Sequence, residues 1–459
     1  MHTTNIGCRH LCRWGLSGPA APRHALPNGN RIVLGERRIG RPDVALSAVT
    51  RQGFWVFVGL VSVSALGFAF WILAARLFPT EAVGVAGSLV SLSTFGAAFA
   101  VLGLDAGLVR FAPHALHPRK LIRSVVVVTG LLAGGIGVLL PLFLLSMGTV
   151  GSSARLPLIG LSLAFTVGTV WTFVMNGAFI AARKAQIPAA ELCAYGLLKI
   201  VLLLALPAAG VVGLFAAYTI PLLPVMLTSF VLLPRTWPGE NPNGRPHALR
   251  DIAGLSAGNW LSAFGYAIPY LCGPALVLYF FDATTAAFFF IALQLGEILN
   301  YGSEALTKSL FAHGSREDRL ARSLRAGVRN RILLVLLPLV ALGILLAPSI
   351  AAAVGGASFR QHALIVQLFL IATIPRGLYN VVRVQFNVDR RPRALALCGA
   401  VFAAVTMTGF VIGLLVHGSP DVLPAAWLAG GISVLGFSRR LAARYGMNAR
   451  QGSSEPQNG

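Results

Sequence analysis

Charged residues are scarce in this chain, and acidic residues are the scarcest of them. Asp, Glu, Lys and Arg make up 11% of the 459 residues, and the mean hydropathy is +0.75. Soluble domains contain about 25% charged residues, so the composition excludes a soluble protein and indicates an integral membrane protein. The 37 Lys and Arg exceed the 15 Asp and Glu, which gives a formal charge of +22. In this apolar setting the excess predicts basic cytoplasmic loops rather than binding to nucleic acid.

Catalytic and metal-binding motifs are also missing. There are five cysteines, of which three lie in apolar runs as small hydrophobic residues. Cys8, His10 and Cys12 could together hold a metal ion, but no second ligand cluster accompanies them. The phosphate-binding pattern GxxxxGK followed by Ser or Thr does not occur, which excludes an ATP motor within the chain. We therefore predict that the protein is not an enzyme and has no cofactor or metal site.

Twelve long apolar runs are present, each close to the ~20 residues that a helix needs to cross a bilayer. They predict an all-α integral membrane protein with two six-helix bundles. The weakest division lies between residues 187 and 233, where only Pro207 and Gly210 separate two runs, and the last run is short. The predicted spans are 54–77, 83–108, 124–147, 157–181, 187–208, 211–233, 254–280, 286–310, 332–354, 363–387, 394–416 and 421–437.

Basic residues sort unevenly between alternate loops. If the N-terminus is cytoplasmic, twenty Lys and Arg fall in inward loops, whereas only Arg76, Arg155 and Arg360 fall in outward loops. Cytoplasmic loops carry the excess of basic residues in membrane proteins. The sorting therefore predicts a multi-pass protein of the cytoplasmic membrane with both termini in the cytoplasm. The outward loops are all short, which argues against an extracytoplasmic catalytic domain.

The polar segments outside the runs define the predicted organisation. Residues 1–50 are rich in Arg, Pro and Gly and predict a disordered, basic cytoplasmic tail. The segment 235–250 also contains Pro and Gly and is the predicted cytoplasmic linker between the halves. The N-terminal bundle then covers 51–234, the C-terminal bundle covers 251–438, and residues 439–459 form a second cytoplasmic tail.

Two distant stretches share a pattern and indicate that the halves are related. Each begins Gly-x-Trp, at Gly53 and at Gly258, and each closes on Phe-Ala followed by a histidine, at His114 and at His313. Their separation of about 200 residues is typical of an internal repeat in a transporter. In the second stretch we expect two long helices joined by a turn at residues 281–284.

One wall of the predicted eighth span is polar. Ionisable groups inside a bilayer are expensive and indicate a functional site by default. The polar residues that fall within a sector of roughly 120°, at 100° per residue, are Gln294, Glu297, Asn300, Glu304 and Lys308.

A second polar face lies on the predicted tenth span. Arg376 is near the middle of this span, and Asn380 and Arg383 follow at i+4 and i+7, on one narrow face. The eighth and tenth spans both run from outside to inside. Glu297 can therefore share a depth with Arg376, and Glu304 with Arg383.

Four further polar residues are candidates from their positions alone. Lys199 is central in the fifth span, and Asn176 lies in the fourth. Asn259 opens the seventh span, where capping of the helix is the alternative role. Asp105, at the end of the second span, can form a local ion pair with Arg110.

Two interpretations of these residues stay open. In the functional one they line a water-filled cavity between the bundles, where cations bind an anionic substrate and amides bind sugar hydroxyls. In the other, Glu297–Arg376 and Glu304–Arg383 are buried ion pairs that fix helix register. For Arg383, near the inner end of its span, contact with the lipid headgroups is a further alternative. Glu297, Glu304 and Asp105 are the candidates for binding a coupling ion.

Three stretches resemble one family of transporters. The segments LFPTEAVGVAGSLVSL and LGLDAGLVRF are similar to the first helical hairpin of Wzx-like polysaccharide and lipopolysaccharide biosynthesis flippases, of the multidrug/oligosaccharidyl-lipid/polysaccharide exporter superfamily. GNWLS, AAFFFIALQLGEIL and LTKSLFAHGSRED resemble the seventh and eighth helices of this family, and IPRGLYNVVRVQFNVDRRPRAL resembles the tenth. The similarity covers about residues 50 to 440. It departs from the family at Phe78-Pro79, where Leu/Gly-Pro is usual.

The resemblance implies a V-shaped pair of six-helix bundles and transport by alternating access. The substrate that it implies is a lipid-linked, pyrophosphate-bearing oligosaccharide or polysaccharide precursor, which moves from the inner to the outer leaflet. Membrane lipids are further implied contacts, and glycosyltransferases or a polymerase of glycan assembly are possible protein partners.

Other function classes remain as alternatives. A multidrug or organic-cation antiporter of the same superfamily would favour an acidic, aromatic cavity, whereas Arg376 and Lys199 favour an anion. A major-facilitator carrier would need an Asp-Arg/Lys-x-Gly-Arg/Lys pattern after the second span, and the chain has Asp-Ala-Gly-Leu-Val-Arg there. A membrane glycosyltransferase would need a large outward loop. A membrane protein that transports nothing is the last alternative.

The predicted topology can be tested with reporter fusions. A reporter fused at Pro238 should be cytoplasmic, because this position lies in the linker between the halves, and one fused at Gly418 should be external. Alkaline phosphatase and green fluorescent protein fusions report the two sides. The opposite result at either position would contradict the twelve-span topology.

Overall fold

All regular structure in the described part of the chain is helical, apart from one isolated β-bridge. Residues 49–459 form one compact unit, and the contacts described below lie within it. Of the remaining unit, residues 1–48, the structure covers only the first residues of the first helix. The computed structural model describes residues 42–146, 150–246, 249–314, 318–355, 360, 363–389, 391–416 and 420–445.

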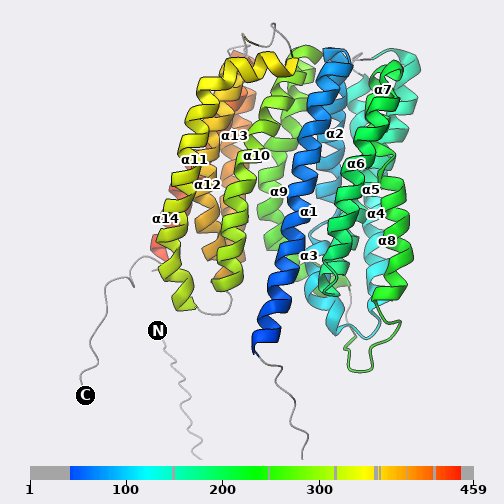
Figure 1. Ribbon diagram of the computed structural model, residues 1–459, viewed down its shortest axis with the longest axis vertical. Coiled ribbons are helices and arrows are strands. Elements are labelled where there is room, and N and C mark those ends of the chain that lie inside the picture. Colours follow the sequence, from blue (N-terminus) through cyan, green and yellow to red (C-terminus); the bar gives the residue numbers. More distant parts are fainter. Residues whose placement is uncertain are drawn as a thin grey trace, which may run out of the picture. The chain divides into compact units, whose positions relative to one another are not determined.

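Long helices run side by side through the described unit. Figure 1 shows α11, α12 and α14 on one side, α4 to α8 on the other, and α1, α2, α9 and α10 between them. In chain order the elements are α1 (Pro42–Leu77), α2 (Thr80–Ala100), α3 (Leu104–Phe111), η1 (Ala112–His114), α4 (Pro118–Ser146), α5 (Ser152–Ala181), α6 (Gln186–Ala205), η2 (Pro207–Ala209), α7 (Gly210–Thr219), α8 (Leu222–Thr236), α9 (Leu249–Phe280), α10 (Ala283–Gly314), α11 (Asp318–Gly355), α12 (Ala363–Val388), α13 (Pro392–Val416) and α14 (Val422–Arg444).

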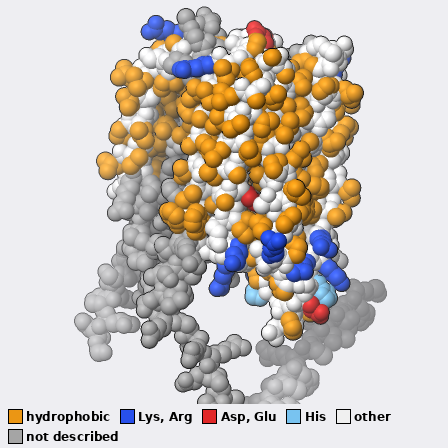
Figure 2. Space-filling view, turned by 45° about the vertical axis from the view of Figure 1, so that its right-hand side comes forward, with side chains coloured by type: hydrophobic (Ala, Val, Ile, Leu, Met, Phe, Trp, Pro, Cys, Tyr) orange, Lys and Arg blue, Asp and Glu red, His pale blue; other side chains and the backbone are white. Residues whose placement is uncertain are grey.

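Twelve spans in the described residues are long and apolar enough to cross a membrane, which confirms the predicted all-α membrane fold. Their outward faces carry large apolar side chains that remain accessible, such as Leu131, Leu156 and Leu334, each at least 74% exposed. Such faces suit hydrocarbon rather than water. Figure 2 shows an apolar surface over most of this view, with Lys and Arg side chains at its two ends, more of them at the lower end than at the upper.

The predicted second span, 83–108, is interrupted in the structure. Helix α2 ends at Ala100, and Leu102 and Gly103 both adopt positive φ, at 49° and 70°. A left-handed backbone cannot continue an α-helix. The chain therefore restarts in α3, which packs on α5 where Gly177 approaches the carbonyl oxygen of Asp105. The sequence signal was Gly103, because glycine adopts this conformation without a steric penalty.

Other helix boundaries also differ from the predicted ones. The sixth span is divided between α7 and α8 near Pro221, whose nitrogen cannot donate a helical hydrogen bond. Helix α11 begins at Asp318, so much of the predicted inward loop 311–331 is helical. Helix α1 begins at Pro42, inside the predicted tail 1–50, and the earlier residues of that tail lie outside the described part. The second tail is helical up to Arg444, and its residues from 446 onward also lie outside.

Helices α2, α9 and α10 form the seam between the two halves. At the start of α2, a Cβ added at Gly84 would clash with the carbonyl oxygen of Ala283 on α10. Ser88 Oγ donates to the carbonyl oxygen of Pro274 on α9, at 3.0 Å. Small side chains thus let the helix backbones approach closely, as at other helix contacts in membranes.

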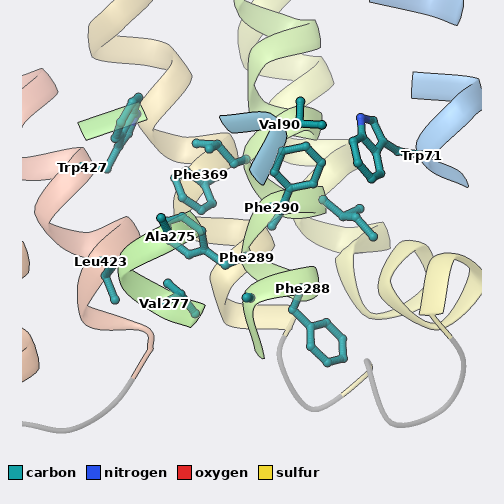
Figure 3. Close-up of a cluster of buried hydrophobic side chains, with 14 of the residues drawn as sticks. Trp71, Val90, Ala275, Val277, Phe288, Phe289, Phe290, Phe369, Leu423 and Trp427 are labelled. Carbon is teal, nitrogen blue, oxygen red and sulfur yellow. The ribbon is translucent and has the colours of Figure 1, made fainter. Parts of the chain in front are cut away.

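Aromatic side chains extend this seam in both directions. Figure 3 shows Trp71 of α1 beside Phe290 of α10, and their ring centroids are 4.5 Å apart. At the other end of α2, the ring of Phe95 stacks on Phe264, and Trp260 Nε1 donates to the carbonyl oxygen of Ala98 at 3.0 Å. The two halves are therefore in contact along the whole length of α2.

The segment after α8 is held against the loop between α3 and α4. Arg245 N donates to the carbonyl oxygen of His114, and Leu116 N donates to that of Arg245, at 2.8 and 2.9 Å. Arg119 donates to the carbonyl oxygens of Pro234 and Trp237, near the C-terminal end of α8. The first part of the predicted linker 235–250 is thus fixed to the N-terminal half, and Leu249 already starts α9.

The close contact at Gly84 leads to a testable expectation. Gly84→Leu should lower the melting temperature of the purified protein by several degrees, since overpacking typically costs ~1–3 kcal/mol. Gly135→Leu is the matched control, because Gly135 is also a helical glycine in a span but has open space around its Cβ direction. Equal melting temperatures for Gly84→Leu and the wild type would contradict the close approach of α2 and α10.

Candidate functional site

Arg376 and Glu297 form an ion pair in the middle of the C-terminal half. Nη1 of Arg376 donates to Oε1 of Glu297. Glu297 is 14 residues from Ala283, the first residue of α10, and Arg376 is 13 residues from Ala363, the first of α12. The predicted shared depth of the two residues is therefore confirmed. The side chain of Glu297 is 9% exposed, whereas that of Arg376 retains 20% of its surface.

The amide of Asn300 lies one turn further along α10, between Arg376 and Asn380. One of its two terminal atoms is 3.3 Å from Asn380 Nδ2, and the other is 3.2 and 3.3 Å from Nε and Nη2 of Arg376. With the oxygen on the arginine side, Asn300 accepts from the guanidinium. Asn380 Nδ2 lies 3.1 Å from Ser303 Oγ. Four of these five polar residues were predicted to share a site, and the structure joins them.

Aromatic side chains from α14 and α9 cover this network. The guanidinium carbon of Arg376 lies 5.9 Å from the ring centroid of Trp427, within the range of a cation–π interaction. Tyr270 Oη donates to Oε1 of Gln294 at 2.9 Å, and the rings of Tyr270 and Trp427 are 6.1 Å apart. The guanidinium is thus held by a carboxylate, an amide and a ring.

The sequence did not single out Trp427, Tyr270 or Ser303. Trp427 lies on the short last span, where nothing in the local pattern marks it. Tyr270 follows Pro269 inside α9, and that interruption of an apolar helix was the available signal. Ser303 is six residues after Glu297. It is neither acidic nor an amide, and it was therefore not counted in the polar wall of the predicted eighth span.

Three predicted site residues lie toward the ends of their spans that the predicted topology places on the cytoplasmic side. Arg383 is half-buried and interacts electrostatically with Tyr266 and Tyr379. The side chains of Glu304 and Asn259 lie outside the described residues. The predicted pair Glu304–Arg383 therefore stays a prediction.

Lys199 lies in the other half of the protein, away from Arg376. Its side chain is 1% exposed, and its Nζ is 4.7 Å from the ring centroid of Tyr218, 4.9 Å from that of Tyr195 and 5.5 Å from that of Phe70. These rings come from α7, α6 and α1. Within the described residues the structure does not bring Lys199 and Arg376 into one cluster.

A buried carboxylate lies two turns before Lys199 on the same helix. Glu191 Oε1 accepts from Ser229 Oγ of α8 at 2.8 Å, whereas Oε2 has no hydrogen-bond partner among the described residues. The Oδ1 atom of Asn176 in α5 is likewise buried without a partner. These polar atoms belong to the N-terminal half and lie outside the network around Arg376.

Asp105 and Arg110 do not form the predicted ion pair in the described structure. The two residues are five apart on α3, which places them about 140° apart around the helix axis, whereas partners need i+3 or i+4 spacing. Burial raises the pKa of the Asp105 carboxyl above its usual value. In the described residues no three His, Cys, Asp or Glu side chains gather where they could hold a metal ion.

Solved structures with the same architecture come from transporters of the MOP superfamily. A multidrug resistance MATE family transporter in an inward-facing conformation matches with a TM-score of 0.65 and 17% identity, over 86% of this chain and 99% of that chain. The lipid II flippase MurJ, in an inward closed conformation, matches with a TM-score of 0.61 and 12% identity, over 84% and 87%.

A third solved structure with a similar fold has a binding pocket of unusual polarity. It is a MOP superfamily transporter from Pyrococcus furiosus. Its binding pocket is described as having reverse polarity, which suggests a different function for that protein. The TM-score is 0.58 and the identity 15%, over 86% of this chain and 95% of that chain. No family model and no curated protein matches the sequence. The chain thus has the 6+6 helical fold of MOP-superfamily transporters.

Proposed function

We propose that this protein is a flippase that moves an anionic, lipid-linked glycan across the cytoplasmic membrane by alternating access. The substrate class is a polyprenyl diphosphate that carries an oligosaccharide or a polysaccharide precursor. With the orientation predicted from the basic loops, the glycan enters from the cytoplasmic side and leaves in the outer leaflet. Transport requires the two halves to separate at the seam of α2 with α9 and α10.

The observation that carries this proposal is the guanidinium of Arg376 at the middle of a membrane span. An arginine at the centre of a helix in a bilayer costs at least ~2.5–3.5 kcal/mol on insertion scales. Packing alone would not need that charge, because apolar residues of similar size can replace a buried ion pair with little loss. Arg376 also keeps one fifth of its side-chain surface accessible, as a group that receives a ligand requires.

The neighbouring side chains suit the two parts of such a headgroup. The planar guanidinium binds phosphate oxygens through paired hydrogen bonds. Asn300, Asn380 and Gln294 supply amides that can bind sugar hydroxyls, and Trp427 and Tyr270 supply rings for the sugar faces. Lys199 is fully buried in the other half, so the proposal rests on Arg376 alone.

An exporter of organic cations is the second candidate. The fold shared with MATE transporters favours it, as do the aromatic rings of Tyr270, Phe402 and Trp427 near Arg376. In that case Glu297 would be the substrate ligand, and Arg376 would compete with the cation for it. Glu297→Gln should then abolish transport of a cationic dye. The flippase proposal predicts no saturable dye transport by the wild type.

The proposal is tested with purified protein in vesicles and a fluorescent polyprenyl diphosphate that carries one N-acetylglucosamine. Arg376→Ala should slow flipping of this probe by about 10- to 100-fold, which corresponds to the ~1.5–3 kcal/mol of hydrogen bonds to a charged group. Arg376→Lys should retain part of the rate, because the charge survives without the paired donors. Dithionite quenching of the outer leaflet measures the rate. Arg360→Ala is the control, since Arg360 is exposed and lies outside the spans.

The register interpretation predicts a different pattern. If Arg376 only neutralises Glu297, each single substitution should destabilise the protein by ~3–5 kcal/mol, the cost of breaking a buried pair. The double variant Arg376→Leu with Glu297→Leu should then recover both stability and flipping. Recovery of flipping in the double variant would overturn the proposed role of Arg376 in substrate binding.

A further inference from the structure

The seam between the halves is built differently at its two ends. Near the start of α2, a Cβ added at Gly84 would clash with the carbonyl oxygen of Ala283 on α10. One turn later, a Cβ added at Gly87 would lie 2.9 Å from the ring of Phe290. Both glycines are buried. At this end the two halves are therefore packed with backbone directly against backbone.

Four aromatic rings join the halves at the other end of α2. Phe95 and Phe99 come from α2, and Trp260 and Phe264 come from α9. The ring centroids of Phe95 and Phe264 are 5.3 Å apart and those of Trp260 and Phe264 are 4.9 Å apart, and both pairs are stacked. The ring of Phe99 meets those of Phe264 and Trp260 edge-on, at 5.4 and 5.8 Å. We call these four residues the aromatic clasp.

The end of α2 supplies a hydrogen-bond acceptor to the clasp. In an unbroken helix the N–H of Leu102 would donate to the carbonyl oxygen of Ala98. In this structure it donates to the carbonyl oxygen of Phe99, at 3.2 Å, where the helix ends. The carbonyl oxygen of Ala98 accepts instead from Trp260 Nε1 of the other half, at 3.0 Å. The helix break thus offers α9 an acceptor that a continuous helix would use itself.

The clasp lies at an accessible edge of the seam. Phe99 is 40% exposed, and Phe95, Trp260 and Phe264 are half-buried, whereas Phe290 at the other end is 2% exposed. Partly exposed rings can separate without leaving an empty cavity, which is the costly part of losing a buried contact. The seam should therefore open more readily at the clasp than at the glycine contact.

We propose that the aromatic clasp is the gate between the halves at its end of the seam, and that Gly84 and Ala283 are the pivot about which the halves move when it opens. Phe99 lies 15 residues, or about 22 Å, from Gly84 along α2 at 1.5 Å per residue. A small rotation at the pivot therefore becomes a displacement of several ångströms at the clasp. The predicted topology places the clasp on the cytoplasmic side. This inference goes beyond the proposed function, because it holds for whichever substrate is carried.

Distances between spin labels on the full-length protein in nanodiscs test this motion at both ends. Double electron–electron resonance measures them after the five native cysteines have been replaced by serine. Lys184→Cys and Arg393→Cys place one label on each half at the clasp end. Ser153→Cys and Val416→Cys do the same at the pivot end, and all four positions are exposed.

Removing the ring of Trp260 should open the clasp end alone. The wild type should give one main distance for the label pair at that end. Trp260→Ala removes two ring contacts and a hydrogen bond, and should raise the ratio of open to closed molecules about tenfold, the effect of ~1.4 kcal/mol. Open molecules contribute a distance that is longer by several ångströms. The distance at the pivot end should change much less.

Trp171→Ala is the matched control. Trp171 is also half-buried, its Nε1 donates to the carbonyl oxygen of Val126 at 3.0 Å, and its ring centroid is 5.5 Å from that of Phe230. These contacts lie within the N-terminal half, so both label pairs should remain as in the wild type. Phe99→Ala is a second clasp variant, chosen because a partly exposed side chain is lost with little risk to folding. It should also lengthen the distance at the clasp end.

Three results would overturn the inference. An unchanged distance at the clasp end in both Trp260→Ala and Phe99→Ala would mean that the rings do not hold a gate. Equal lengthening at both ends in Trp260→Ala would contradict the pivot at Gly84. An equal shift in Trp171→Ala would mean that loss of any such ring loosens the protein. The measurement contains no substrate, so a failure of the proposed glycan transport is a separate result and leaves it unaffected.

Discussion

The cost of placing charge inside a bilayer is the constraint on which the interior of this protein depends. Arg376 and Glu297 meet at one depth on parallel helices, and their pairing lets both stay ionised between apolar walls. The pair connects α10 and α12, and α10 also belongs to the seam between the halves. The same contact therefore joins two helices of the C-terminal half at one depth.

Periodicity and charge made much of this arrangement predictable from the sequence. Apolar runs of the right length gave the twelve spans, and the 100° spacing of Gln294, Glu297 and Asn300 placed them on one face of α10. Positions near the middle of two spans that run in the same direction then paired Glu297 with Arg376. These features are local to one helix, or follow from the fixed rise per residue, and they need no knowledge of packing.

Features that depend on contacts between helices were not predictable. Trp427 and Tyr270 reach Arg376 and Gln294 only because α14 and α9 pack beside α10 and α12. Lys199, like Arg376, is a basic residue at the middle of a predicted span. In the structure, however, aromatic rings from α1, α6 and α7 surround Lys199 and bury it in the N-terminal half. The break after Ala100 depends on backbone angles at Leu102 and Gly103, and of these two residues only the glycine carried a signal in the sequence.

The central claim is that the guanidinium of Arg376 binds the phosphate of the substrate. Solid-state NMR of protein labelled with ¹⁵N-arginine, in vesicles that contain the polyprenyl diphosphate probe, measures the contact between guanidinium nitrogen and phosphorus. The account predicts ³¹P dephasing of one arginine signal that is absent in Arg376→Lys. Dephasing that persists unchanged in Arg376→Lys would contradict it, because the phosphate would then be bound by another arginine.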